Sequence, residues 1–213
     1  TSISKMKYDS LELKNITGNI QLKDAVASME EIKMEIFDGN IKLNGDYKAL
    51  NPKRAKIDFA YDINNLDFKQ AFNYFNTVQK YASIAQYCNG KFSTSMTIEA
   101  ELDENYSPIY ESITGLGDFK SSQVKLDDIP LLEKATQLIK IKDLKNQTLQ
   151  NLNISYEFKE GKIWVEETPI KLGKIDSKIS GTTSFTQEIN YIWDATLPSE
   201  MFGSNANEIA NNL

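Results

Sequence analysis

The segment from Phe92 to Leu102 alternates apolar and polar side chains over its whole length. One parity carries Phe92, Thr94, Met96, Ile98, Ala100 and Leu102, and the other carries Ser93, Ser95, Thr97, Glu99 and Glu101. Because successive side chains of a strand point to opposite faces, this is the pattern of a long β-strand with one apolar and one polar face. Whatever covers the apolar face therefore largely determines what the protein does.

The same one-sided alternation returns along most of the chain. It predicts further strands in the ranges 16–22, 32–36, 41–47, 57–63, 115–126, 152–158, 162–165, 174–185 and 189–197. Asp38-Gly39 predicts a hairpin, Asn51-Pro52 marks a loop and Glu160-Gly161 forms a further turn. Gly181 predicts a bulge or a close approach of another segment.

Two segments have helical spacing instead. The first, between 67 and 86, contains no Gly or Pro. Its residues Phe68, Phe72 and Phe75 share one helical face, and Asn65 or Asp67 is placed to cap its start. This aromatic stripe either packs on the sheet or contacts lipid when the helix is displaced. A short helical turn is expected within 105–113. A second long helix is indicated by an Asp cap and a first-turn Pro, followed by apolar residues: Asp127, Asp128, Pro130, Leu131, Leu132, Ala135, Leu138 and Ile139.

These patterns predict an α+β fold of mainly antiparallel β structure, with a strongly curved sheet (a half-barrel or groove) and two main helices packed on its concave face. The 213 residues, 40% of them hydrophobic, suit a single domain over 1–213. The Asn-rich and Ala-rich tail 204–213 is expected to be frayed helix or disorder. The chain opens on Thr1 with no initiator Met, which indicates a piece of a longer protein. No apolar run approaches the roughly 18 residues of a membrane span.

The residue chemistry offers no reaction. The chain has no histidine, and its single cysteine, Cys88, has no base to activate it. The net charge of −6 argues against nucleic acid as a partner. The range 62–67 has the oxygen spacing of a calcium loop but lacks its central Gly and closing Glu. Glu99 and Glu101 share the polar face, where a solvated strand is the simpler reading than an acid pair. We expect no catalytic residue, cofactor or metal.

A resemblance to a known family rests on a series of short hairpin phrases. They are Phe37-Asp38-Gly39-Asn40-Ile41-Lys42-Leu43-Asn44-Gly45, Gly45-Asp46-Tyr47, Asn89-Gly90-Lys91-Phe92-Ser93-Thr94, Ser112-Ile113-Thr114-Gly115-Leu116-Gly117, Val124-Lys125-Leu126, Leu131-Leu132-Glu133-Lys134-Ala135, Glu160-Gly161-Lys162-Ile163, Ile179-Ser180-Gly181-Thr182-Thr183-Ser184-Phe185 and Leu197-Pro198. In this order, over most of residues 11–198, the series resembles the C-terminal region of the AsmA family. The order carries the resemblance, because each phrase alone is common to β-meanders.

The resemblance implies a non-enzymatic periplasmic segment of an AsmA-like cell-envelope protein, involved in outer-membrane biogenesis or in phospholipid transport between membranes. Members of the family are similar to bridge-like lipid-transfer proteins, and an N-terminal helix anchors them in the inner membrane. That anchor would lie outside the present sequence. The partners implied are phospholipid or another envelope lipid, and envelope proteins.

The candidate lipid contacts are apolar residues on the predicted inner face of the sheet and on the first helix: Phe59, Tyr61, Phe68, Phe72, Phe75, Phe92, Met96, Ile98 and Leu102. Each is also a candidate core residue. The alternative is a structural or protein-binding β module whose own helices fill the sheet. A third hypothesis, a glycosidase built on acidic pairs, lacks an evident buried carboxylate pair.

Overall fold

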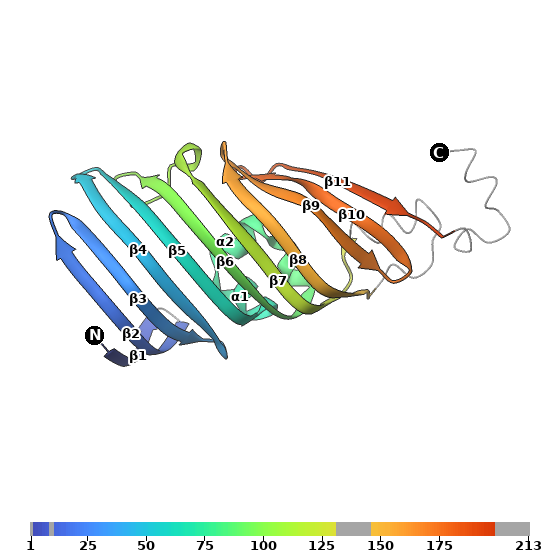
Figure 1. Ribbon diagram of the computed structural model, residues 1–213, viewed down its shortest axis with the longest axis horizontal. Helices are drawn as coiled ribbons and strands as arrows, with labels where there is room; N and C mark the ends of the chain where they lie inside the picture. The colour runs from blue at the N-terminus through green and yellow to red at the C-terminus, as the bar shows by residue number, and fades with distance from the viewer. Residues whose placement is uncertain (1, 9–10, 131–145, 199–213) are drawn as a thin grey trace.

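A computed structural model describes residues 2–8, 11–130 and 146–198 of the chain. Eleven strands pair in sequence order into one antiparallel sheet (Figure 1). The strands are β1 (Ser2–Tyr8), β2 (Leu11–Lys23), β3 (Val26–Ile36), β4 (Gly39–Asn51), β5 (Arg54–Asp67), β6 (Cys88–Leu102), β7 (Thr114–Leu126), β8 (Thr148–Lys159), β9 (Lys162–Leu172), β10 (Ile175–Ser184) and β11 (Ile189–Thr196). The prediction of mainly antiparallel β structure is confirmed.

The strands match the ranges that alternation predicts and are mostly longer, although β10 lacks residues 174 and 185 and β11 lacks residue 197. The predicted hairpin after β3, the loop after β4 and the turn after β8 all join neighbouring strands. Near Gly181 the register of β9 and β10 shifts, and a Cβ there would overlap the Asn190 carbonyl oxygen of β11, which confirms the predicted bulge or close approach. Strand β1 was not predicted, because Ile3 and Met6 fall on opposite parities and give no one-sided pattern.

The first predicted helix is present but broken. Helix α1 (Phe68–Tyr74) ends at Phe75, whose backbone is extended, and α2 (Asn76–Tyr81) and the 3-10 helix η1 (Ser83–Tyr87) follow. The Gln79 side-chain amide donates to the carbonyls of Phe72 (2.8 Å) and Asn73 (3.4 Å). It thereby satisfies acceptors that a continuous helix would have paired itself. Asp67 caps α1 as predicted, since its Oδ1 accepts from the Gln70 amide at 2.9 Å.

The other helical predictions have different outcomes. The predicted short turn is the 3-10 helix η2 (Tyr110–Ser112). The second long helix, with its residues from Leu131 to Ile139, falls outside the described part of the chain. Of the two main helices that the sequence predicts, the described residues therefore contain one, in shortened pieces.

The prediction of a strongly curved half-barrel or groove is wrong, because the sheet is not strongly curled. Its edge strands β1 and β11 stand at opposite ends of an extended array (Figure 1). Alternation determines which side of each strand is buried. Curvature depends instead on twist and on where bulges fall in successive strands, and side-chain parity carries no information about either.

The helices lie on one face of the sheet, behind it in Figure 1, and we call this the apolar face. Three clusters of buried residues form there. One joins α1 to β6, β7 and β10 and includes Phe68, Val124 and Ile175. A second joins α1 to β2, β3 and β5. The third, which we call the Phe185 cluster, comprises Ala100, Ile113 and Phe185 with the side chains packed on them.

Candidate functional site: an apolar strip on the sheet

The register of the central strands builds two adjacent rows of apolar side chains. In one row, Phe59 of β5 pairs with Ile98 of β6, and the row continues through Gly115 to Phe158 of β8. In the next row, Tyr61 pairs with Met96, and that row continues through Gly117 to Tyr156. The apolar strip, as we call these rows, comprises Phe59, Tyr61, Met96, Ile98, Tyr156 and Phe158. All six are half-buried.

Glycines let the aromatic rings of the strip lie low on the sheet. A Cβ on Gly117 would overlap the ring of Tyr156, and a Cβ on Gly45 would come within 2.6 Å of the Phe59 ring. Each ring therefore covers the bare backbone of the neighbouring strand. The rings also meet edge-on along each strand, with centroids 5.8 Å apart for Phe59 and Tyr61. The result is a broad aromatic surface rather than a row of upright side chains.

The strip contains two hydroxyl groups, those of Tyr61 and Tyr156, and the Tyr156 hydroxyl has hydrogen-bond partners. Its oxygen lies 3.0 Å from Thr94 Oγ1 and 3.7 Å from Met96 Sδ. Burial raises the pKa of Tyr156 and likewise that of Tyr61. Both phenols thus stay neutral over the ordinary pH range, and the strip carries no charge of its own. An uncharged surface of this kind suits apolar ligands.

The predicted contact residues fall into two groups. Phe68, Phe72, Phe75 and Phe92 pack where the helices meet the sheet, and the Phe68 and Phe92 ring centroids are 4.9 Å apart. Leu102 is buried at the end of β6, where it bridges to Pro108. Phe68 and Leu102 are buried core residues, and Phe72, Phe75 and Phe92 are half-buried and pack against the core. The other four (Phe59, Tyr61, Met96 and Ile98) lie together in the apolar strip.

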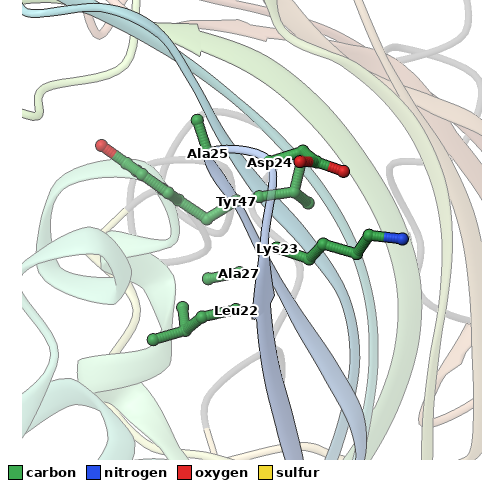
Figure 2. A pocket seen from close by; sticks show the side chains of 7 residues that line it. Leu22, Lys23, Asp24, Ala25, Ala27 and Tyr47 are labelled. Carbon is green, nitrogen blue, oxygen red and sulfur yellow. The ribbon is translucent and has the colours of Figure 1, made fainter.

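Near the β2–β3 hairpin the apolar face is hollowed into an open depression of about 440 Å³. Figure 2 shows Leu22, Ala27 and Tyr47 pointing to one side of the ribbon and Lys23 to the other. Leu22 is 79% exposed, so this rim is unusually apolar for a surface. The pairing Leu22–Ala27–Tyr47 continues to Ile57 of β5, which packs on the Phe185 cluster. The depression therefore adjoins the region of the strip.

The carboxylates that might have formed an acid pair lie on the opposite, polar face. Glu99 forms an ion pair with Lys56 at 2.7 Å, and Glu101 pairs with Arg54. All four side chains are between 41% and 49% exposed. The range 62–67 belongs to β5, with a register shift between Ile63 and Leu66, and its last residue, Asp67, caps α1.

No group of three or more His, Cys, Asp or Glu side chains within 2–8, 11–130 and 146–198 is placed to hold a metal ion. In the same ranges, no helix has the length and apolar character to cross a membrane.

Sequence reasoning omitted several residues of this region. Tyr156 and Phe158 belong to the predicted alternation of β8, and Leu22 and Tyr47 to those of β2 and β4. Alternation identifies their face, but only the register of neighbouring strands brings them beside Met96 or Ile57. These residues are far apart in the sequence, since Tyr156 and Met96 are separated by sixty residues. Alternation within one strand therefore gives no sign that they lie close together.

Comparison with known proteins identifies no relative of this chain. No protein-family model matches it, and neither a curated protein nor a solved structure matches it significantly.

Proposed function

We propose that this chain is a non-enzymatic lipid-binding segment of a cell-envelope protein. The observation that carries the proposal is the apolar strip, a half-buried uncharged surface that adjoins an open depression, whose lining is mostly apolar but includes Lys23 and Asp24. Soluble proteins rarely leave wide apolar surface in contact with water unless something binds it. A lipid acyl chain is a suitable occupant, because each methylene that leaves water gains about 0.8 kcal/mol.

The shape of the region supports an elongated ligand. From Leu22 of β2 through Ala27 and Tyr47 to Ile57 of β5, the paired positions cross three strand spacings. At about 4.8 Å per spacing the path is about 14 Å long, which is the length scale of a fatty acyl chain. An acyl chain can follow this path without meeting a charged side chain of the row.

The resemblance to the AsmA family supplies the cellular setting of the proposal. In that setting the segment acts in the periplasm, in outer-membrane biogenesis or in phospholipid transport between the two membranes, and its partners are phospholipids and envelope proteins. The protein shields acyl chains from water and performs no reaction. The alternative is a structural or protein-binding β module, in which the half-buried strip is covered by protein alone.

The decisive test is native mass spectrometry of the full chain after expression in bacteria and gentle purification. The expected result is a species that is heavier than the free protein by the mass of one or more phospholipids. Leu22→Glu should lower the bound fraction at least threefold, because a carboxylate in the depression opposes an acyl chain. The matched control is Gln21→Glu, which adds the same charge at the next residue, on the polar face.

Since Leu22 is 79% exposed, neither substitution should unfold the protein, and circular dichroism checks this. Consistently lipid-free protein that also fails to enhance the fluorescence of apolar probes would favour the protein-binding alternative. Equal loss of lipid in both variants would show that overall charge, and not the depression, determines binding.

A further inference from the structure

Three polar groups converge beside the Phe185 cluster from two distant segments. Lys80 and Tyr81 end helix α2, and Tyr110 begins η2, thirty residues further along the chain. Aromatic packing holds both phenols: the Tyr110 and Phe185 rings stack at 5.2 Å, and the Tyr81 ring meets Phe185 edge-on at 5.3 Å. The two hydroxyl groups are thus presented by rings that have little freedom to move.

The hydrogen bonds within this group leave donors unused. The Tyr81 hydroxyl donates to the Tyr110 oxygen at 3.0 Å, and Lys80 Nζ donates to the same oxygen at 3.5 Å. With both lone pairs of its oxygen occupied, Tyr110 must direct its own proton to a third group. Among the described residues no acceptor takes that proton. The Lys80 ammonium likewise has further N–H groups beyond the one it gives to Tyr110.

The charge of the group is positive. Within the described part of the chain, no carboxylate forms an ion pair with Lys80, although exposed lysines elsewhere pair with glutamates, as Lys56 does with Glu99. Its ammonium lies over the rings of Tyr81 (5.3 Å) and Tyr110 (5.7 Å), which stabilise a cation. One positive charge with outward N–H and O–H donors is the arrangement that binds an oxyanion.

The group also borders the apolar face. Ile57, the β5 member of the row that begins in the depression, packs on the same cluster as Tyr81 and Tyr110. An amphiphile lying along that row would bring its polar end to these donors. The tyrosine rings would contact the apolar part of the ligand, and their hydroxyl groups its charged part.

We propose that Lys80, Tyr81 and Tyr110 bind the phosphate group of an anionic lipid whose acyl chains lie on the apolar face. The inference rests on the proposed lipid-binding function and adds to it a preference for a charged headgroup. Free inorganic phosphate offers the same oxyanion chemistry, so the test must separate the two sources.

The test measures binding of three ligands to the full chain by isothermal titration calorimetry: the short-chain lipids dioctanoyl phosphatidylglycerol and dioctanoylglycerol, and inorganic phosphate. The affinity for phosphatidylglycerol should fall about tenfold in Lys80→Gln and about threefold in Tyr110→Phe, whereas the affinity for dioctanoylglycerol should not change in either variant. The matched control is Lys69→Gln, which removes an exposed lysine from the neighbouring helix α1. It should bind all ligands like the unsubstituted protein.

The outcomes separate the two proposals. If dioctanoylglycerol binds, but the affinity for phosphatidylglycerol falls no more in Lys80→Gln than in Lys69→Gln, the headgroup site is refuted and lipid binding stands. If neither lipid binds, both proposals fail. If inorganic phosphate binds as tightly as the lipid, and with the same dependence on Lys80, the site takes free phosphate and the lipid assignment is overturned.

Discussion

At the level of single residues, Gly117 determines how the Tyr156 ring lies in the apolar strip. We expect Gly117→Ala to lower the free energy of unfolding by about 1–2 kcal/mol, because the new methyl group overlaps the ring and displaces it. Displacement also breaks the 3.0 Å hydrogen bond between Tyr156 and Thr94. Urea unfolding followed by circular dichroism measures the change.

A double-mutant cycle isolates the ring as the cause. In a Tyr156→Ala background the Gly117→Ala substitution should cost clearly less, since no ring remains to be displaced. An unchanged cost in that background would place the effect in the backbone of β7 instead. Gly117 suits this cycle because its φ does not lie in the left-handed region, unlike that of Gly45 at +142°.

The β3–β4 hairpin shows what the sequence conveys at this scale and what it does not. Asp38-Gly39 correctly indicates a turn, yet the residues with positive φ are Phe37 (+46°) and Asp38 (+59°), and Gly39 already pairs with Ile36. A phenylalanine is costly in that conformation. It is held there because its ring packs on Tyr74 at 4.7 Å, a contact with the helical segment that no local pattern can indicate.

At the level of elements, the helical segment over β5 and β6 depends on its cap. Asp67→Ala should cost about 1 kcal/mol of stability, because the amide of Gln70 loses its acceptor at the start of α1. Amide hydrogen exchange at Gln70 should accelerate in parallel. Asp67→Ser keeps an acceptor oxygen and should restore most of the loss, whereas an equal loss in both variants would rule out capping as the cause.

The strands were more predictable than the helices for a physical reason. A strand buried on one side repeats its signal every two residues, so Ile57, Phe59, Tyr61 and Ile63 identify β5 without reference to the rest of the fold. The break at Phe75 depends on tertiary packing and on the Gln79 side chain, since no Gly or Pro marks it. The meeting of Lys80 with Tyr110 likewise depends on how separate segments pack.

At the scale of the whole molecule, the sheet is an open array in which each strand contacts its sequence neighbours. Its edges are β1 and β11, and Ile189 and Ile192 of β11 are 73% and 67% exposed. The clusters of buried side chains lie on one face, and the other face carries cross-strand ion pairs. The stability of such a sheet depends strongly on the few side chains that the helical segment helps to bury.

Burial of titratable groups on that single face predicts how stability changes with pH. Burial raises the pKa of the Cys88 thiol from 9.0 to about 11, and it raises the pKa values of Tyr61 and Tyr156 above 10.0. The unfolded chain therefore loses these protons at a lower pH than the folded chain. Their contribution to stability is complete below about pH 9 and is lost as the pH rises, through about 11 for Cys88.

The free energy of unfolding, measured in urea from pH 8 to pH 11.5, should accordingly fall, with the Cys88 share about 2–3 kcal/mol. Tyr110 opposes this fall in stability below pH 10, because hydrogen bonds from Tyr81 and Lys80 lower its pKa.

Tyr61→Phe should flatten the fall in the free energy of unfolding above pH 10. The matched control is Tyr106→Phe, which removes a hydroxyl from a side chain that is 73% exposed and should retain the full decline. The same slope in both variants would mean that the phenol of Tyr61 is accessible to water, and the apolar strip would then be more open than its burial indicates.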